Sequence, residues 1–339
     1  MPLVTERIEL GGDGEAEGMV VLLHGLDHSP EPMKPVVRAL EELRRFMAAQ
    51  GATPPRLRVL APYRGAPDRP GFDERRATLE SLVEAYYAPL APGGAGVPVV
   101  TIGESLGAAL SDVWSWREPG IAHQIWLDPL PARLALIAFD RALVAAAMLA
   151  QFASFRLRRL GLNLTGPLDR AMLREALDPR SRGDRERYLR QKMQAPHWRW
   201  ALVEARLILR MALAGPSAPR PPPDRLTPVT TFLPPRGPSW LDRKVVGPAA
   251  HRIAVASFSG RKGARIAHAK AGTHYNLSEM AAPYVAWRAL AGLGLSRCGA
   301  FFEEWPLAAR FADHYWAAVA VSAASAPGTP ELASHLAEG

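Results

Sequence analysis

A Gly-x-Ser-x-Gly pentapeptide centred on Ser105 is placed between a strand-like run and a helix-like run. The residues before it, 97–102, are apolar and β-branched, which is typical of a strand buried on both faces. The residues after it, 106–116, carry apolar side chains at helical spacing. Such a tight turn would project Ser105 from the end of a sheet and leave the N–H of Leu106 at a helix N-terminus. Ser105 is therefore a candidate nucleophile, and a serine in an ordinary strand-to-helix loop is the plain alternative.

The first part of the chain alternates strand-like and helix-like runs. Repeated alternation of this kind predicts an α/β fold with a mostly parallel, doubly wound sheet and helices on both faces. The expected strands are 19–23, 57–61, 97–102 and 124–128, and the expected helices are 31–50, 72–87 and 106–116.

The alternation stops after residue 130. Residues 131–213 show only helical periodicity, and a proline-rich connector at 215–223 follows them. Proline-rich chain cannot form a helix interior or a central strand, so an extended return to the sheet is expected. The predicted organisation is a core of residues 1–130 and 226–325, a helical cap over 131–225, and a flexible tail over 326–339.

The later elements follow from shorter patterns. Strands are expected at 229–233, 252–258 and 264–270, and a helix is expected at 306–320.

The net charge of +8 does not by itself indicate a nucleic-acid partner. The basic residues are scattered among acids, and the sequence contains no nucleic-acid-binding module. The densest basic segment, 180–190, includes Asp184 and Glu186 and is interpreted as a solvated helical face. Attraction of anionic substrates, or peripheral contact with a lipid surface, is left open.

Cysteine content and apolar runs bear on the compartment. Cys298 is the one cysteine, which excludes an internal disulfide and a multi-cysteine zinc site, and it is interpreted as a small core residue. The N-terminal residues show no apolar signal core, so a cytoplasmic location is expected. The longest apolar stretch, 134–152, is interrupted by Asp140-Arg141, which favours an amphipathic helix over a stable membrane span.

A nucleophilic serine needs a general base. His274 is the candidate because its Gly-Thr-His-Tyr-Asn loop follows a late strand. The alternative is a loop histidine hydrogen-bonded to Asn276. The other histidines are more typical of packing or surface positions; those considered are His123, His197, His251 and His268.

The base in turn needs an orienting acid. Asp242 follows the strand at 229–233 and precedes His274, which gives the chain order serine, aspartate, histidine. Asp128 is the rival, because it ends the strand that follows the helix after Ser105. The alternative for Asp242 is a surface ion pair with Arg243 or Lys244.

An oxyanion hole needs N–H donors aimed at the developing negative charge. His24-Gly25-Leu26 directly follows the first buried strand, and Gly25 permits a sharp turn there. The N–H groups of Leu26 and Leu106 are the candidate donors.

These residues together resemble the α/β-hydrolase superfamily, and the position of the helical insertion is similar to that of capped esterases and monoacylglycerol lipases. The resemblance covers about residues 17–320 as an ordered set: Leu22-Leu23-His24-Gly25, Gly103-Glu104-Ser105-Leu106-Gly107, a later aspartate, and Gly272-Thr273-His274. The chain departs from the usual pattern in its proline-rich 234–238 segment, its long arginine-rich cap, and the stretch between His274 and Glu303. The first departure weakens the assignment of Asp242.

The resemblance implies a serine hydrolase that cleaves a carboxylic ester through an acyl-enzyme, with no metal and no organic cofactor. Serine in place of an aspartate nucleophile disfavours epoxide hydrolase and haloalkane dehalogenase chemistry. Apolar cap residues such as Phe139 and Leu143 would contact an apolar acyl or alkyl chain, or simply pack the cap, and Gly25 and Glu104 complete the candidate substrate contacts. A thioesterase, an acyltransferase, a C–C bond or peptide hydrolase, and a non-catalytic ligand-binding protein remain alternatives.

Overall fold

The structure is a computed structural model of the 339-residue chain. It describes residues 5–11, 14–26, 29–64, 72–90, 96–130, 176–192, 195–214, 227–233, 265–268, 276–295 and 317–320, together with a few single residues between 142 and 174 and Trp305.

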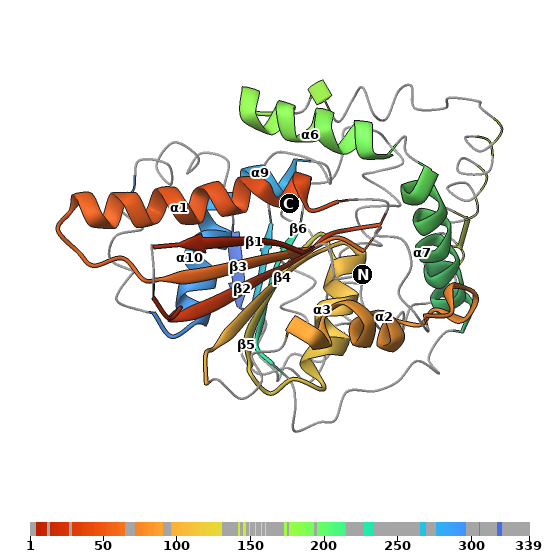
Figure 1. Cartoon of the computed structure of the whole chain (residues 1–339), viewed down its shortest axis with the longest axis horizontal. Coiled ribbons are helices and arrows are strands. Elements are labelled where there is room, and N and C mark those ends of the chain that lie inside the picture. Colours follow the sequence, from red (N-terminus) through yellow and green to blue (C-terminus); the bar gives the residue numbers. More distant parts are fainter. Residues whose placement is uncertain are drawn as a thin grey trace.

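The centre of the molecule is an eight-stranded sheet in the order β1-β3-β2-β4-β5-β6-β7-β8 (Figure 1). The six inner strands run parallel, and the two edge strands pair antiparallel with their neighbours. Their bounds are β1 Thr5–Leu10, β2 Gly18–Leu23, β3 Leu57–Pro62, β4 Val99–Glu104, β5 Ile121–Leu127, β6 Val229–Leu233, β7 Arg265–His268 and β8 Ala317–Ala320.

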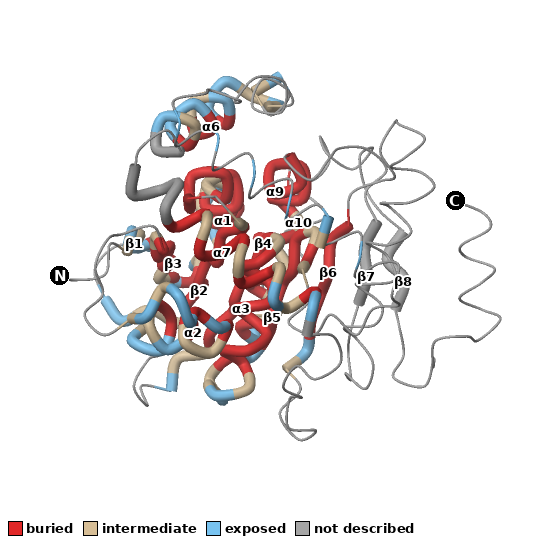
Figure 2. Tube along the Cα trace, turned by 90° about the vertical axis from the view of Figure 1, so that its right-hand side faces the viewer, coloured by how far each residue is buried: buried red, intermediate tan, exposed pale blue. Residues whose placement is uncertain are grey.

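Both faces of the sheet are covered by helices. Alternate residues of β2 belong to different core clusters: Val20 and Leu22 to one, Val21 and Leu23 to the other. This period of two is what a strand covered on both sides requires. Figure 2 shows α1 and α9 above the sheet and α2 and α3 below it. The bounds are α1 Lys34–Ala49, α2 Leu79–Tyr86, α3 Leu106–Ser115, α9 Leu277–Met280 and α10 Ala282–Gly292, with short 3-10 helices η1 Glu31–Met33, η2 Glu74–Arg76 and η3 Ala88–Leu90.

The chain between β5 and β6 contributes the helices α6 (Pro179–Lys192) and α7 (Ala195–Ala214). α6 packs on α1 and η1, on the side of α1 away from the sheet (Figures 1 and 2). Asp184 accepts hydrogen bonds from Arg38 of α1 and from Arg187, and Arg187 also pairs with Glu31 at 3.2 Å. The helix expected in 180–190 is confirmed, but the expectation that it is a solvated face is wrong on one side, because Asp184 and Arg185 are buried.

A second buried ion pair joins α6 to α9. Glu279 accepts from the Arg185 guanidinium at 2.9 Å and from the backbone N–H groups of Leu177 and Asp178 at 2.9 and 3.0 Å. The carboxylate therefore holds the start of α6 against α9.

α7 packs by a different mode, through aromatic and aliphatic side chains. The Trp200 ring lies 5.6 Å from the Phe72 ring and 5.5 Å from the Tyr86 ring. Trp200, Val203 and Leu207 belong to the core cluster on the α2 and α3 side of the sheet. The apolar face of α7 is therefore continuous with the core below the sheet.

The predicted strand and helix alternation is confirmed, but several elements differ. The expected 31–50 helix is divided into η1 and α1, and α9 and α10 were not expected. The edge strand β1 was not expected, because it lacks a continuous apolar run; three of its six residues are exposed and one is buried. The expected 72–87 helix is divided, since Thr78 and Ser81 form a reciprocal capping box that starts α2 at Leu79. The predicted helix over 306–320 is wrong at its end, where β8 pairs with β7. The sequence of β8, Ala-Ala-Val-Ala, is a short run of small apolar residues that suits either structure, and the pairing decides.

Other expectations concern parts of the chain that the structure covers only partly. The expected strand at 252–258 and Cys298 lie outside the described residues, and the division into core, cap and tail remains a prediction. No helix in the described part of the chain is both long enough and apolar enough to cross a bilayer.

Burial of Glu279 leads to a prediction about pH. Burial raises the pKa of Glu279 above its ordinary value, although the Leu177 N–H and Arg185 oppose the shift. A carboxyl group whose pKa is raised in the folded state stabilises the folded protein at low pH. This contribution is lost as the pH rises through the raised pKa. We therefore expect the unfolding free energy of Glu279→Gln, relative to the wild type, to increase as urea titrations move from pH 4 to pH 7. Glu186→Gln, on the exposed side of α6, is the control; a relative stability that falls with pH for Glu279→Gln would contradict the prediction.

Candidate active site

The candidate residues follow the carboxyl ends of parallel strands, which meet at one edge of the sheet. The turn His24 to Leu26 follows β2, Ser105 follows β4, and Asp128 follows β5. β4 neighbours β2 on one side and β5 on the other. The topology thus places Ser105 between the other two segments, at the edge where open α/β sheets bind ligands.

Ser105 has an unusual backbone. Its φ of 50° and ψ of −115° lie where a residue with a side chain is strained. Hydrogen bonds maintain this conformation: the Ser105 N–H donates to the Leu127 carbonyl, and its carbonyl accepts from the N–H groups of Ala108 and Leu130, all at 3.0 Å. Ser105 stands at the N-cap of α3, but its hydroxyl does not cap the helix. The residue is partly exposed.

The two glycines of the pentapeptide are required by close packing. A Cβ on Gly103 would lie 2.6 Å from the Ala108 nitrogen, within the first turn of α3. A Cβ on Gly107 would overlap the Leu23 carbonyl oxygen and lie 2.9 Å from that of His24. α3 therefore begins in direct backbone contact with the end of β2.

This contact brings together the two segments that carry the candidate oxyanion donors, the start of α3 and the turn after β2. Leu106 opens α3, whose first N–H groups have no acceptor within the helix. Leu26 lies two residues after His24, whose carbonyl faces Gly107. Neither the Leu26 nor the Leu106 N–H donates a hydrogen bond to another of the described residues.

The turn after β2 is held by a residue that the sequence analysis missed. Arg64, which follows β3, is fully buried, and its Nη2 donates to the carbonyl oxygens of His24 at 2.8 Å and Gly25 at 3.0 Å. The His24 imidazole adds a bond between Nδ1 and the Gly25 carbonyl at 3.0 Å. The carbonyl groups of the turn thus point toward Arg64.

The remaining donors of Arg64 are also used. Its Nε donates to Glu204 of α7 at 2.6 Å, and its Nη1 donates to the Tyr87 hydroxyl at 2.8 Å. Glu204 accepts a further bond from the Trp200 indole at 3.0 Å. Burial opposes the charge of Arg64, but Glu204 and Tyr87 outweigh it and raise the pKa of the guanidinium. Burial also raises the pKa of Tyr87, against the influence of Arg64. In the sequence, Arg64 is an arginine two residues after the end of a strand. Because the chain contains many arginines, this position alone does not indicate a buried residue at the site.

A buried polar network supports α3 from the sheet side. Gln124 of β5 accepts from the Ser111 hydroxyl at 2.8 Å and donates to the Ser115 hydroxyl at 2.8 Å. Thr101 of β4 is bonded to Ser111 at 2.6 Å, and the Trp126 indole donates to Gln124 at 3.1 Å. These bonds fix the rotation of α3 against β4 and β5, and with it the direction of its first turn.

Asp128, the rival acid, lies beside Ser105 in the sheet. The register pairs Glu104 with Leu127, so Asp128 is opposite Ser105, and its φ of 41° is the other positive value among described residues that are not glycine. Its N–H donates to the Phe232 carbonyl at 2.8 Å. Two strained residues thus lie next to each other at one edge, as is typical of functional sites.

Several predicted residues lie outside the described part of the chain. These are Asp242, which follows β6; His274, between β7 and α9; and the cap residues Phe139 and Leu143. Their roles remain predictions. Gly25 lies in the turn held by Arg64, and Glu104 is buried at the end of β4. His123 is confirmed as a packing residue, buried and bonded to Thr230 at 3.0 Å.

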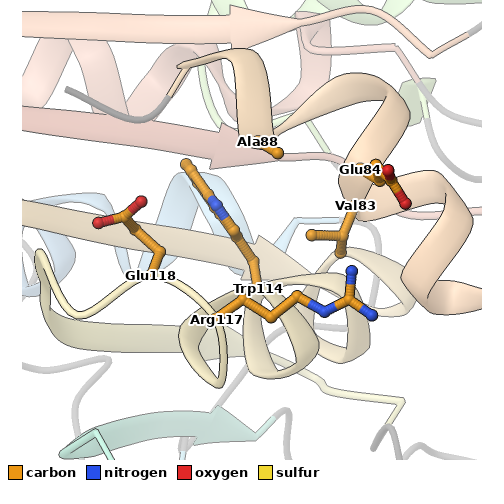
Figure 3. Close-up of a pocket in the computed structure, with 6 residues that line it drawn as sticks. All are labelled: Val83, Glu84, Ala88, Trp114, Arg117 and Glu118. Carbon is orange, nitrogen blue, oxygen red and sulfur yellow. The ribbon is translucent and has the colours of Figure 1, made fainter. Parts of the chain in front are cut away.

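Two further features bear on what the site can hold. Within the described ranges, no cluster of three or more histidine, cysteine or acidic residues is arranged to bind a metal. A surface hollow of about 280 Å³ lies between α2 and α3, and Figure 3 shows its lining side chains. The hollow includes Trp114 and Arg117, at the opposite end of α3 from Ser105, so it is not the candidate site.

Comparison with solved structures identifies proteins of similar fold. The chain is similar to a carboxylesterase from the ammonia-oxidizing thaumarchaeon Nitrososphaera gargenis, with 11% identity over 87% of this chain and 95% of the other, at a TM-score of 0.54. It is similar to the epoxide hydrolase CorEH, with 15% identity over 85% and 95% of the two chains and a TM-score of 0.52. It is also similar to a putative ancestral haloalkane dehalogenase, with 16% identity over 86% and 98% and a TM-score of 0.51. No protein-family model matches the chain, and no curated protein matches it in sequence.

The contact at Gly107 gives a prediction about stability. Gly107→Ala would place a methyl group on backbone atoms of β2 that cannot rotate away, so we expect a loss of about 1–3 kcal/mol or more in the free energy of unfolding. Gly183→Ala is the matched control, because a Cβ there meets no atom within 4 Å and α6 should gain about 0.5–1 kcal/mol. Denaturant titration of both variants measures the difference. If Gly107→Ala and Gly183→Ala were equally stable, the inferred backbone contact between α3 and β2 would be contradicted.

Proposed function

This chain has the α/β-hydrolase fold, and from that fold we propose that the protein is a serine hydrolase with Ser105 as its nucleophile. The proposed reaction is hydrolysis of a carboxylic ester, with an apolar acyl or alkyl group, through an acyl-enzyme intermediate.

The observation that carries the proposal is the conformation of Ser105. A serine with positive φ, between two glycines that admit no Cβ, stands on a turn from a buried strand to a helix. That geometry is the one expected of a nucleophile elbow. Strain of about 1–3 kcal/mol at such a residue persists only where the surrounding structure enforces it, and here three backbone hydrogen bonds do so.

In the proposed mechanism, His274 removes the proton of the Ser105 hydroxyl as its oxygen attacks the ester carbonyl carbon. The N–H groups of Leu26 and Leu106 would stabilise the oxyanion that forms. His274 then gives the proton to the departing alcohol, and the C–O bond breaks. Water attacks the acyl-enzyme with His274 as general base, and Ser105 is released with the carboxylic acid. No metal or cofactor takes part.

Asp242 is the proposed acid, with Asp128 as its rival. Asp242 follows β6 in the chain order that the superfamily resemblance implies, while Asp128 follows β5 at a strained position opposite Ser105. Either aspartate follows a strand whose carboxyl end is at the edge of the sheet that holds Ser105.

The similar structures leave the chemistry open, because the carboxylesterase, the epoxide hydrolase and the dehalogenase have one fold. Serine at the nucleophile position favours ester hydrolysis over the other two reactions. A thioesterase or acyltransferase would use the same residues and differ only in the leaving group or acceptor. A non-catalytic ligand-binding protein would not need a strained, partly exposed serine.

Labelling with a fluorophosphonate tests the nucleophile. We expect the wild type to be modified at Ser105 and to hydrolyse p-nitrophenyl esters, because an activated serine attacks phosphorus as it attacks an acyl carbon. Ser105→Ala should not be labelled and should lose roughly 10³-fold or more of its ester turnover.

Ser81→Ala is the control serine variant, since its hydroxyl is bonded within the capping box that starts α2. It should be labelled at the wild-type rate. A wild-type protein that is not labelled would overturn the serine hydrolase, and labelling without hydrolysis but with transfer to an added alcohol would favour the acyltransferase.

Replacing each aspartate distinguishes the two acids. Loss of the triad acid lowers kcat by up to about 10⁴-fold because the histidine loses its orientation. We expect Asp242→Asn to show a loss of this order and Asp128→Asn to retain most of the activity, measured as kcat on one ester over pH 5–9. The reverse ranking would assign the role to Asp128.

A further inference from the structure

The buried Arg64 side chain contacts the turn that carries the candidate donor Leu26. We propose that Arg64 is a positioning residue of the oxyanion hole: it fixes the His24-Gly25-Leu26 turn and so aims the Leu26 N–H. The proposal rests on the proposed function, because it assigns Leu26 as an oxyanion donor.

The argument begins with the geometry of the peptide group. No described peptide bond is cis, and in a trans peptide the carbonyl and the N–H point in opposite directions. The Gly25 carbonyl accepts from Arg64 at 3.0 Å. The N–H on the same peptide plane, that of Leu26, therefore points away from Arg64. Holding the carbonyl on one side is equivalent to aiming the donor on the other.

The same guanidinium nitrogen also holds the preceding peptide. Nη2 of Arg64 donates to the His24 carbonyl at 2.8 Å, so two successive peptide planes are fixed by one group. The loop would otherwise be free to rotate about Gly25, which has no side chain to restrict it. Arg64 removes this freedom before substrate binds, as an oxyanion hole requires.

His24 adds a second restraint that also depends on the Arg64 segment. The Arg64 backbone N–H points to His24 Nε2 at 3.4 Å, which makes Nε2 the acceptor. The proton of the neutral ring is then on Nδ1, which donates to the Gly25 carbonyl at 3.0 Å. The side chain of Arg64 thus contacts the carbonyls of the turn, and its backbone contacts the His24 ring.

Arginine is the side chain suited to this task. It offers five N–H donors in a rigid planar fork, and here Nε, Nη1 and Nη2 contact Glu204, Tyr87 and the turn. Lysine would keep the positive charge but could not reach these three directions from one nitrogen. The pairing with Glu204 also makes the local charge neutral, so orientation of the turn is the contribution of Arg64.

The test compares Arg64→Lys with the double variant Arg64→Met/Glu204→Gln. Lysine retains the positive charge but lacks the planar set of guanidinium donors. The double variant removes both charges, so no unpaired charge remains buried. We expect kcat for a p-nitrophenyl ester to fall about 10- to 100-fold in both, since loss of one oxyanion donor costs about 10²–10³-fold. KM should change less than about threefold. Affinity for a trifluoromethyl ketone, whose hemiketal oxygen mimics the oxyanion, should fall by the same factor as kcat.

The matched control is Arg44→Met. Arg44 is also a buried arginine that donates to a backbone carbonyl, that of Pro55 at 2.5 Å, but Pro55 precedes β3 whereas Arg64 follows it. Arg44→Met should lower the melting temperature and leave kcat unchanged. Wild-type kcat in folded Arg64→Lys, or an equal loss of kcat in Arg44→Met, would overturn the positioning role.

A measurement that does not depend on turnover separates this proposal from the proposed function. The amide ¹H and ¹⁵N chemical shifts of Gly25 and Leu26, and the ¹⁵N shifts of the His24 ring, should report an ordered turn with the proton on Nδ1 in the wild type. Both should change in Arg64→Lys and not in Arg44→Met. Unchanged signals in Arg64→Lys would overturn the proposal that Arg64 orders the turn. Absence of Ser105 labelling in the wild type would instead overturn the serine hydrolase.

Discussion

The backbone contact between the first turn of α3 and the end of β2 is the constraint on which the candidate site depends. Only glycine can occupy position 107, because any side chain would overlap the Leu23 carbonyl. This close approach places the N-terminus of α3 beside the turn after β2. Ser105, which connects β4 to α3 two residues before this contact, has a positive φ that three backbone hydrogen bonds maintain. The packing requirement at Gly107 therefore brings together the two segments that carry the candidate donors.

Polar groups buried around this contact keep its parts in register. Between α3 and the sheet, hydrogen bonds among Thr101, Ser111 and Gln124 leave each of these side chains satisfied, so the helix cannot rotate without losing several bonds at once. Beside the turn, the Arg64 guanidinium plays the equivalent part for the chain after β2. Apolar packing positions the helices on the sheet, while these directional bonds set the orientation of particular peptides and side chains. A site that must present an N–H at a defined angle needs the second kind of interaction.

Much of the core could be predicted from the sequence, because a strand covered on both faces is a short run of mostly apolar and β-branched residues and a helix repeats its apolar residues every three or four. The runs at 19–23, 97–102 and 229–233 illustrate this, and each is a strand of the sheet. β1 and β8 could not be predicted in the same way, because an edge strand is defined by its pairing partner. Ser105 could be proposed as a nucleophile because the pattern that indicates it consists of residues next to it in the chain.

Arg64 and Glu204 were missed for the opposite reason: they are 140 residues apart, and nothing in either local pattern indicates the other. The buried face of α6 was missed likewise, because Asp184 and Arg185 look solvated until α1 and α9 are placed against them. Charged residues carry little local information about burial, since a charge is buried only where a distant partner compensates it. Buried charged residues whose partners are distant in the sequence are therefore the ones that sequence patterns do not predict. In this chain, Arg64 and Glu204 lie beside the candidate site.

The ion pair between Arg64 and Glu204 also makes α7 part of the site. Both side chains are at most 1% exposed, and the pair joins the chain after β3 to a helix inserted between β5 and β6. Separating α7 from Arg64 would leave a buried charge without its partner, which costs about 3–5 kcal/mol when one member is removed. The apolar contacts of Trp200 with Phe72 and Tyr86 add to that cost. α7 is thus held in place by the group that orders the turn.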